Sequence, residues 1–204
     1  MVNEKVLIKN KHRILKKIIK IFLIISIIGV ILLIAFVIGF SMKNPRNEIV
    51  LENPLKGIVF DNTNEAGLVN KEKVVEQGIM DFNSEYINYL IVALGVNNLH
   101  KSYIGYGDPI IEMKVDGESW TSKVSGGALS TNKGDLEDKD LLITLSKQEA
   151  VEALISPDIS SFMKDSVING NTQIKMIAGK VELGSKGYLA MYKDITGEEM
   201  EIEE

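Results

Sequence analysis

The chain contains no cysteine and only two histidines, His12 and His100, among its 204 residues. Without cysteine it can form neither a disulfide nor a thiolate nucleophile, and a zinc site built from cysteine and histidine is excluded. A serine–histidine–aspartate arrangement would have to use His100, yet no serine lies in a G-x-S-x-G sequence. No phosphate-binding motif is present either. We therefore expect a protein that is not an enzyme and that holds no cofactor.

Acidic residues outnumber basic residues outside the first part of the chain. Seven of them lie between Lys5 and Lys20, so residues 41–204 carry 16 basic and 27 acidic residues, a net charge of −11. Contacts with phosphate groups need clustered lysine and arginine, which this acidic region does not have. We therefore do not expect nucleic acid to be a partner.

One long stretch lacks charge altogether. Residues Ile21–Phe40 are apolar except for a serine and two glycines. A helix of this length matches the hydrocarbon thickness of a bilayer, about 30 Å, and its backbone is hydrogen-bonded internally. A helix buried in a soluble protein would show a polar face, which this stretch does not have. The sequence therefore predicts a single transmembrane helix at 21–40, and the membrane is an expected partner.

The charges that flank this stretch predict its orientation. Residues 1–20 contain seven basic residues and one acidic residue, whereas only two basic residues follow within the next ten positions. Because basic flanks stay inside, we expect a cytoplasmic arm at 1–20 and an extracytoplasmic domain after a single pass through the cell membrane. A cleaved signal peptide is the alternative, since Val37 and Gly39 are small enough to precede a cut before Phe40. Its apolar core would, however, be only about 7–15 residues long.

Composition also divides the rest of the chain. Residues 41–70 mix proline and glycine with two short β-prone pieces, which is typical of a stalk. We expect the globular domain at 71–197. The last residues, 198–204, predict a solvated acidic tail.

Helical spacing begins with the domain. Apolar residues predict a helix over 71–80, and a second helix should follow Asn83 or Ser84, either of which can cap it. This second helix should end before Gly95, which fits the position after a helix C-terminus.

The period of the pattern then changes from helical to alternating. Residues 111–115 and 120–124 alternate between apolar and polar, and Asp116-Gly117 between them predicts a hairpin. A third strand over 128–131 has a weaker pattern.

An exposed acidic loop is expected at 132–140. Its four acids do not match the D-x-[DN]-x-[DN]-G pattern of a calcium loop, so we expect no metal there. These acids are Asp135, Glu137, Asp138 and Asp140.

The densest local signals follow this loop. Leu141–Leu145 predicts a strand, and Ser146 stands three residues before Glu149, a capping box that opens a helix. The other expected elements are a helix begun by Ser156-Pro157, alternating residues at 174–176 and 181–183 on either side of Gly179, and a terminal helix over 185–195.

The order of these elements resembles the second half of a sterol carrier protein type 2 domain, over about residues 84–195. The segment that carries the resemblance is LLITLSKQEAVEALISPDISSFMKDSVINGNTQIKMIAG. The resemblance implies an α+β fold with a mostly antiparallel five-stranded sheet, covered on one face by helices. It also implies a binding protein with a lipophilic tunnel between the sheet and the helices.

An apolar ligand in such a tunnel would gain about 0.8 kcal/mol per buried CH₂ group. On the resemblance, the expected lining is Phe162, Met163, Val167, Ile174, Met176, Leu189 and Met191. The same residues would equally suit a solid core. The competing hypothesis is therefore a protein-docking or structural module of the cell envelope that binds no ligand, with a pilin-like filament subunit as a weaker variant.

Overall fold

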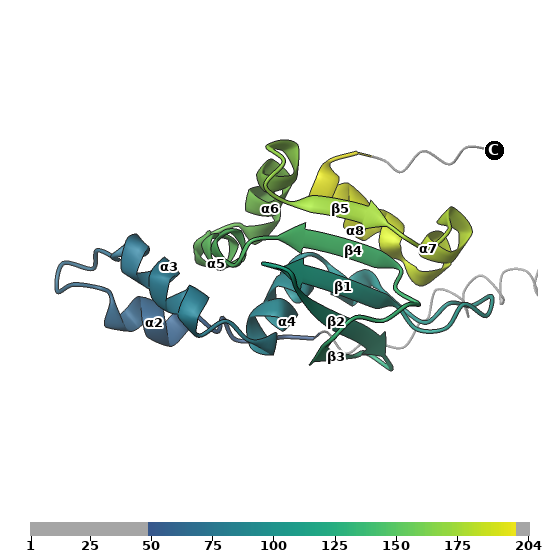
Figure 1. Ribbon diagram of the computed structural model, residues 1–204, viewed down its shortest axis with the longest axis horizontal. Helices are drawn as coiled ribbons and strands as arrows, with labels where there is room; N and C mark the ends of the chain where they lie inside the picture. The colour runs from purple at the N-terminus through teal and green to yellow at the C-terminus, as the bar shows by residue number, and fades with distance from the viewer. Residues whose placement is uncertain (1–48, 199–204) are drawn as a thin grey trace, which may run out of the picture. The chain divides into compact units, whose positions relative to one another are not determined.

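Five strands form one mixed sheet in the computed structural model, which describes residues 49–198 (Figure 1). The strands are β1 (Ile110–Val115), β2 (Glu118–Ser125), β3 (Ala128–Lys133), β4 (Leu141–Leu145) and β5 (Gln173–Met176). Their order across the sheet is β3-β2-β1-β4-β5. Three neighbouring pairs are antiparallel, whereas β1 and β4 run parallel. The α+β class is thus confirmed, and the sheet is mixed.

Seven α-helices and one 3₁₀ helix are found within residues 49–198. They are α2 (Lys56–Asp61), α3 (Lys71–Met80), α4 (Ser84–Ala93), η1 (Val96–Asn98), α5 (Lys147–Ile155), α6 (Ile159–Ile168), α7 (Lys180–Lys186) and α8 (Tyr188–Thr196). In this part of the chain no helix is long and apolar enough to cross a membrane. The transmembrane helix expected at 21–40, the arm before it and the end of the acidic tail lie outside the described residues.

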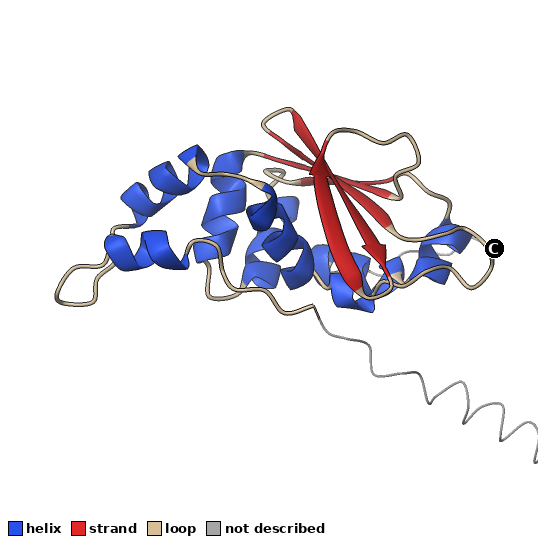
Figure 2. Cartoon of the chain, turned by 90° about the horizontal axis from the view of Figure 1, so that it is seen from below, coloured by secondary structure: helices blue, strands red, loops and turns tan. Residues whose placement is uncertain are grey.

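The two faces of the sheet differ in character. Ile111, Met113 and Val115 are fully buried on one face of β1 and belong to the hydrophobic core. Figure 2 shows the helices gathered on one side of the sheet. On the other face, the hydroxyl of Thr121 donates to the carbonyl oxygen of Gly134 over 2.7 Å, and Lys139 forms an ion pair with Glu112. The loop after β3 therefore covers part of the polar face.

Several local predictions are confirmed. The side chain of Asn83 accepts from the backbone N–H of Glu85, and that of Ser146 accepts from Glu149 N–H. These bonds satisfy amides that the first turn of each helix leaves without a partner. Asp116, at φ 48°, begins the turn between β1 and β2, as the hairpin signal predicts.

Other local predictions are wrong. The helix α6 is capped by Asp158, whose carboxylate accepts from Ser161 N–H, because Ser156 already ends α5. Residues 181–183 lie in α7 and not in a strand, and Gly187 divides the expected terminal helix into α7 and α8.

The expected stalk also differs from the structure. Part of residues 41–70 is folded, since α2 occupies 56–61 and Leu55 is completely buried in the core. A single large aliphatic side chain between two turn-forming stretches carries no periodicity, so the sequence pattern did not indicate this burial. The folded unit therefore begins before the expected boundary at residue 71.

Candidate functional site

A groove of about 670 Å³ lies between α3 and the segment that runs from α5 into α6. Its apolar lining comes from Val75 and Ile79 of α3, and from Ile155, Pro157 and Phe162 on the opposite side. The volume falls within the range of about 300–1,000 Å³ that is usual for small-molecule sites. The groove is open to solvent, and its apolar lining makes it a candidate binding site among the described residues.

The sequence of α3 explains how the groove forms. Val74 and Gly78 are one helical turn apart and buried, so they make the face of α3 that packs on α5. A Cβ atom on Gly78 would lie 2.7 Å from Cγ1 of Val151 and 3.0 Å from Cδ2 of Leu55. Val75 and Ile79, one position further on, consequently face the groove rather than the packed contact.

The rim of the groove is polar and mostly acidic. Glu72 and Glu76 of α3 line one side, and Glu152 of α5 lines the other, whereas Lys71 is the basic lining residue. An apolar floor below charged rims can hold an apolar group while the ionised side chains keep their contact with water.

The seven residues expected to line a tunnel occupy different environments. Met163 and Met191 are fully buried in the core cluster. Phe162, Val167, Ile174 and Met176 are partly buried and pack against that cluster, whereas Leu189 is exposed. Only Phe162 also lines the groove. A ligand between the sheet and the helices therefore stays a prediction.

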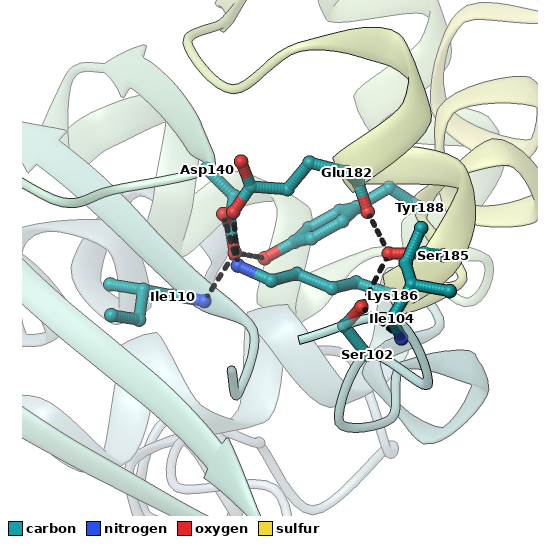
Figure 3. A network of polar contacts seen from close by, with 8 residues as sticks. All are labelled: Ser102, Ile104, Ile110, Asp140, Glu182, Ser185, Lys186 and Tyr188. Carbon is teal, nitrogen blue, oxygen red and sulfur yellow. Dashed lines mark hydrogen bonds and ion pairs between the residues drawn. The ribbon is translucent and has the colours of Figure 1, made fainter. Parts of the chain in front are cut away.

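A second candidate is a buried polar cluster at the end of the sheet, centred on Asp140 (Figure 3). One carboxylate oxygen of Asp140 accepts from Nζ of Lys186 over 2.6 Å. The other accepts from the hydroxyl of Tyr188 over 3.0 Å and from the N–H of Ile110 over 2.8 Å. Asp140, Lys186 and Tyr188 are each at most 2% exposed. The expectation of an exposed loop up to residue 140 is therefore wrong at Asp140.

The cluster perturbs the ionisation of its members. Burial raises the pKa of Asp140, and the bonds from Lys186 and Ile110 offset part of the rise. Burial opposes the charge on Lys186, but its bonds to Asp140 and Glu182 outweigh burial and raise its pKa. Burial, followed by the nearby Asp140, raises the pKa of Tyr188 far above its usual value of 10.0. The shifts of Lys186 and Tyr188 both favour the protonated form, so at neutral pH we expect a charged lysine and a neutral tyrosine beside the Asp140 carboxyl group.

The backbone explains why these side chains can meet. Gly187, at φ 91°, turns the chain between α7 and α8, which brings Lys186 and Tyr188 to the same carboxylate. A Cβ atom at Gly187 would lie 2.5 Å from the carbonyl oxygen of Asn98, so no larger residue fits without a backbone shift. The sequence carried no periodic signal for this cluster, because its members come from a loop and from both sides of a helix break.

The polar contacts continue from the cluster to the loop before β1. Lys186 also pairs with Glu182 over 2.7 Å, and the hydroxyl of Ser185 donates to the carbonyl of Glu182. The hydroxyls of Ser185 and Ser102 are 2.8 Å apart, as Figure 3 shows. Asp140 has a partner on each carboxylate oxygen and almost no solvent contact, so the cluster fixes α7, α8 and β4 to one another.

No group of three or more histidine, aspartate or glutamate side chains within residues 49–198 is arranged to hold a metal ion. The acids expected in the loop at 132–140 are used differently from one another. Asp135 forms an ion pair with Lys139, and Asp140 lies in the buried cluster.

Comparisons with known proteins give no family assignment. No family model matches the chain, and no curated protein matches it. The sec-alkylsulfatase Pisa1 from Pseudomonas sp. is similar at 14% identity over 58% of this chain, with a TM-score of 0.30. A double mutant of that enzyme is similar at 13% identity over 52% of this chain, with a TM-score of 0.32. This chain spans only 16% of either sulfatase chain.

Sterol carrier protein 2 like 2 from Aedes aegypti is similar at 16% identity, over 50% of this chain and 88% of its own, with a TM-score of 0.28. The neighbours thus include an alkylsulfatase and a sterol-carrier-like protein. All of these TM-scores lie below 0.5, so none of the similarities decides the fold or the function of this chain.

Proposed function

We propose that this chain is a membrane-anchored, non-catalytic binding protein whose domain holds a lipid or another elongated apolar molecule in the groove between α3 and α5. In this proposal residues 21–40 span the membrane once, residues 1–20 are cytoplasmic, and the domain lies outside the cytoplasm. The observation that carries the proposal is the groove itself, with its volume of about 670 Å³ and its apolar floor.

The lining of the groove favours an apolar ligand over a polar one. Its apolar residues come from two positions one turn apart on α3 and from the facing segment, so an apolar chain could contact both sides. Each CH₂ group removed from water there contributes about 0.8 kcal/mol. An acyl chain that reaches several of these residues would therefore be held without any specific polar contact.

Photo-crosslinking of the full chain in lipid nanodiscs tests this proposal. A fatty acid that carries a diazirine in its chain is added and activated, and the modified peptides are mapped by mass spectrometry. Crosslinks on the peptides that contain Val75, Ile79 and Phe162 are expected in addition to crosslinks in residues 21–40. An absence of crosslinks on the groove peptides would contradict the proposal.

Two neighbouring substitutions provide a matched comparison. Ile79→Trp fills the groove, whereas Met80→Trp adds the same side chain at a position that is 70% exposed and does not line it. Only Ile79→Trp should reduce the groove crosslinks. If both variants are labelled like the wild type, the probe does not occupy the groove.

A docking module with a solid core is a second candidate, and one observation favours it. Met163 and Met191 are both fully buried in the core cluster that the resemblance would make a tunnel. In a solid core, Met163→Trp should lower the free energy of unfolding by about 1–3 kcal/mol through overpacking. Urea denaturation checks this value. A variant as stable as the wild type would instead indicate space between the sheet and the helices.

A further inference from the structure

The loop that precedes β1 exposes three large side chains within four residues. Tyr103 is 60% exposed, Ile104 is 61% exposed and Tyr106 is 45% exposed. Burial of apolar surface is the main force that stabilises a fold, so a short loop that presents three such groups to water is unusual unless a partner covers them.

The loop is held in shape by its base. The N–H of Ser102 donates to the carbonyl oxygen of Gly107 over 2.8 Å and closes the loop. Ser102 is 7% exposed, and its hydroxyl lies 2.8 Å from that of Ser185 and accepts from Ile104 N–H over 3.2 Å. Gly105 and Gly107 supply the positive φ angles of 99° and 80° that the reversal requires. The three side chains are therefore presented by an ordered base.

The charges around the loop distinguish it from the rest of the domain. Residues 100–107 contain a lysine and a histidine but no acid, and the following Asp108 forms an ion pair with Lys123 over 3.2 Å. The region after residue 40 carries a net charge of −11, so an anionic membrane surface would repel most of it. This loop is an exposed apolar surface without that repulsion.

We propose that residues 102–107 form a membrane-contacting loop that places Tyr103, Ile104 and Tyr106 in the headgroup region of the bilayer. Tyrosine is enriched at this depth because its ring is apolar and its hydroxyl is polar, and an isoleucine between two tyrosines can reach the acyl boundary.

The proposal rests on the proposed membrane anchor. A contact of three side chains is too small for stable binding by itself, and it becomes effective when a second signal keeps the domain at the surface. Eight residues separate Phe40 from Ile49, where the described part of the chain begins. A chain extends by at most about 3.3–3.6 Å per residue, so this connection can hold Ile49 no further than roughly 30 Å from the end of the proposed span.

Site-specific fluorescence tests the proposal on the full chain. Because the chain has no cysteine, Ile104→Cys provides a single attachment site for the polarity-sensitive dye NBD. Phe60→Cys is the matched control. Phe60 is 78% exposed in α2, and Figure 1 shows α2 at the opposite end of the folded domain from the loop before β1. Each labelled chain is reconstituted in vesicles of phosphatidylcholine and phosphatidylserine, with and without a doxyl-labelled lipid.

We expect NBD at position 104 to emit at shorter wavelength and to be quenched by the doxyl lipid, and NBD at position 60 to show neither effect. Equal quenching at both positions, or quenching at position 60 alone, would overturn the proposal. A blue shift at position 104 without quenching would indicate a protein contact and would also overturn it.

Flotation of the vesicles separates this proposal from the anchor on which it rests. A chain that floats with the vesicles but is not quenched at position 104 overturns only the loop contact. A chain that does not float overturns the anchor and the loop contact together. A Tyr103→Ser/Tyr106→Ser variant of the labelled chain should lose the quenching while its circular dichroism spectrum stays unchanged.

Discussion

Tyr188 links the stability of the domain to alkaline pH. Its pKa is raised in the folded protein, so above its usual value of 10.0 the unfolded chain loses a proton that the folded chain keeps. The pKa of Lys186 is raised from 10.5 and acts in the same direction. The stabilisation that both groups contribute is fully present below their ordinary pKa values of 10.0 and 10.5. It is lost as the pH rises through their higher pKa values in the folded protein.

We therefore expect the free energy of unfolding to fall above about pH 10, with Tyr188 contributing a slope of roughly 1.4 kcal/mol per pH unit. Tyr188→Phe removes this contribution and should show a shallower fall, although it is less stable at neutral pH because Asp140 loses a donor. Urea titrations at pH values between neutral and strongly alkaline measure both slopes. Parallel slopes for the two proteins would contradict the assignment.

Gly187 should be the least replaceable glycine near the cluster. Gly187→Ala places a Cβ atom 2.5 Å from the carbonyl oxygen of Asn98, and its φ of 91° is also unfavourable for alanine. Gly105→Ala is a matched control, since Gly105 has a φ of 99° but nothing within 4 Å of its Cβ position. The control should cost about 1–2 kcal/mol for the backbone conformation alone.

The variant at Gly187 should cost more than that control, because the contact is with backbone and a shift there also disturbs Lys186. Thermal unfolding of the two variants measures the difference. Equal losses of stability would show that the close approach to Asn98 is relieved easily.

At the scale of elements, the contact between α3 and α5 depends on the absence of a side chain at Gly78. Alanine favours a helix over glycine by about 1 kcal/mol, but overpacking against Val151 costs about 1–3 kcal/mol. We expect Gly78→Ala to destabilise the wild-type domain. In a Val151→Ala background the closest obstruction is removed, and the vacated space lets Cδ2 of Leu55, 3.0 Å from the Cβ position, move away. The same substitution should then stabilise the domain by up to about 1 kcal/mol.

A double-mutant cycle followed by urea denaturation measures this change of sign. If Gly78→Ala has the same effect in both backgrounds, Val151 is not the residue that limits the approach of α3. The close packing of Gly78 on α5 would then not explain why Val75 and Ile79 face the groove.

Elements with a local signal could be predicted from the sequence, and elements determined by distant contacts could not. The caps at Asn83 and Ser146 and the turn at Asp116 depend on atoms within a few residues of each other. In contrast, Val181, Glu182 and Leu183 alternate between apolar and polar, a pattern that indicates a strand, yet they lie in α7. There Val181 is 67% exposed and Leu183 is 1% exposed, whereas in a strand both would share one face. The packing of α7 on the polar cluster decides its conformation, and that cluster joins residues from three distant segments.

The candidate site shows the same division. Phe162 was expected in a tunnel between the sheet and the helices, whereas in the structure it lines a different groove. The other groove residues Val75 and Ile79 were placed only in a short helix. Their role depends on which face of α3 packs on α5. That face is set by Gly78, and a glycine inside a helical pattern ordinarily indicates only a weaker helix.

For the whole molecule, topology is the first property to test. The absence of cysteine allows single-cysteine variants at Lys5, in the expected cytoplasmic arm, and at Glu65, in the exposed loop between α2 and α3. In intact cells a membrane-impermeant maleimide should label Glu65→Cys and should label Lys5→Cys only after lysis. Labelling in the reverse pattern would contradict the proposed orientation, and labelling of both in intact cells would contradict a single span.

The Asp140 cluster also has a consequence for the route by which the chain folds. Asp140 lies 30 residues after Ile110 and 46 residues before Lys186. In contrast, β1, β2 and β3 are joined by short turns. Closing long loops is entropically costly, so contacts of this kind tend to form after local hairpins. Bonds that form after the transition state slow unfolding without speeding folding. The cluster would then lower the unfolding rate of the domain, so it would determine the lifetime of the folded state more than the folding rate.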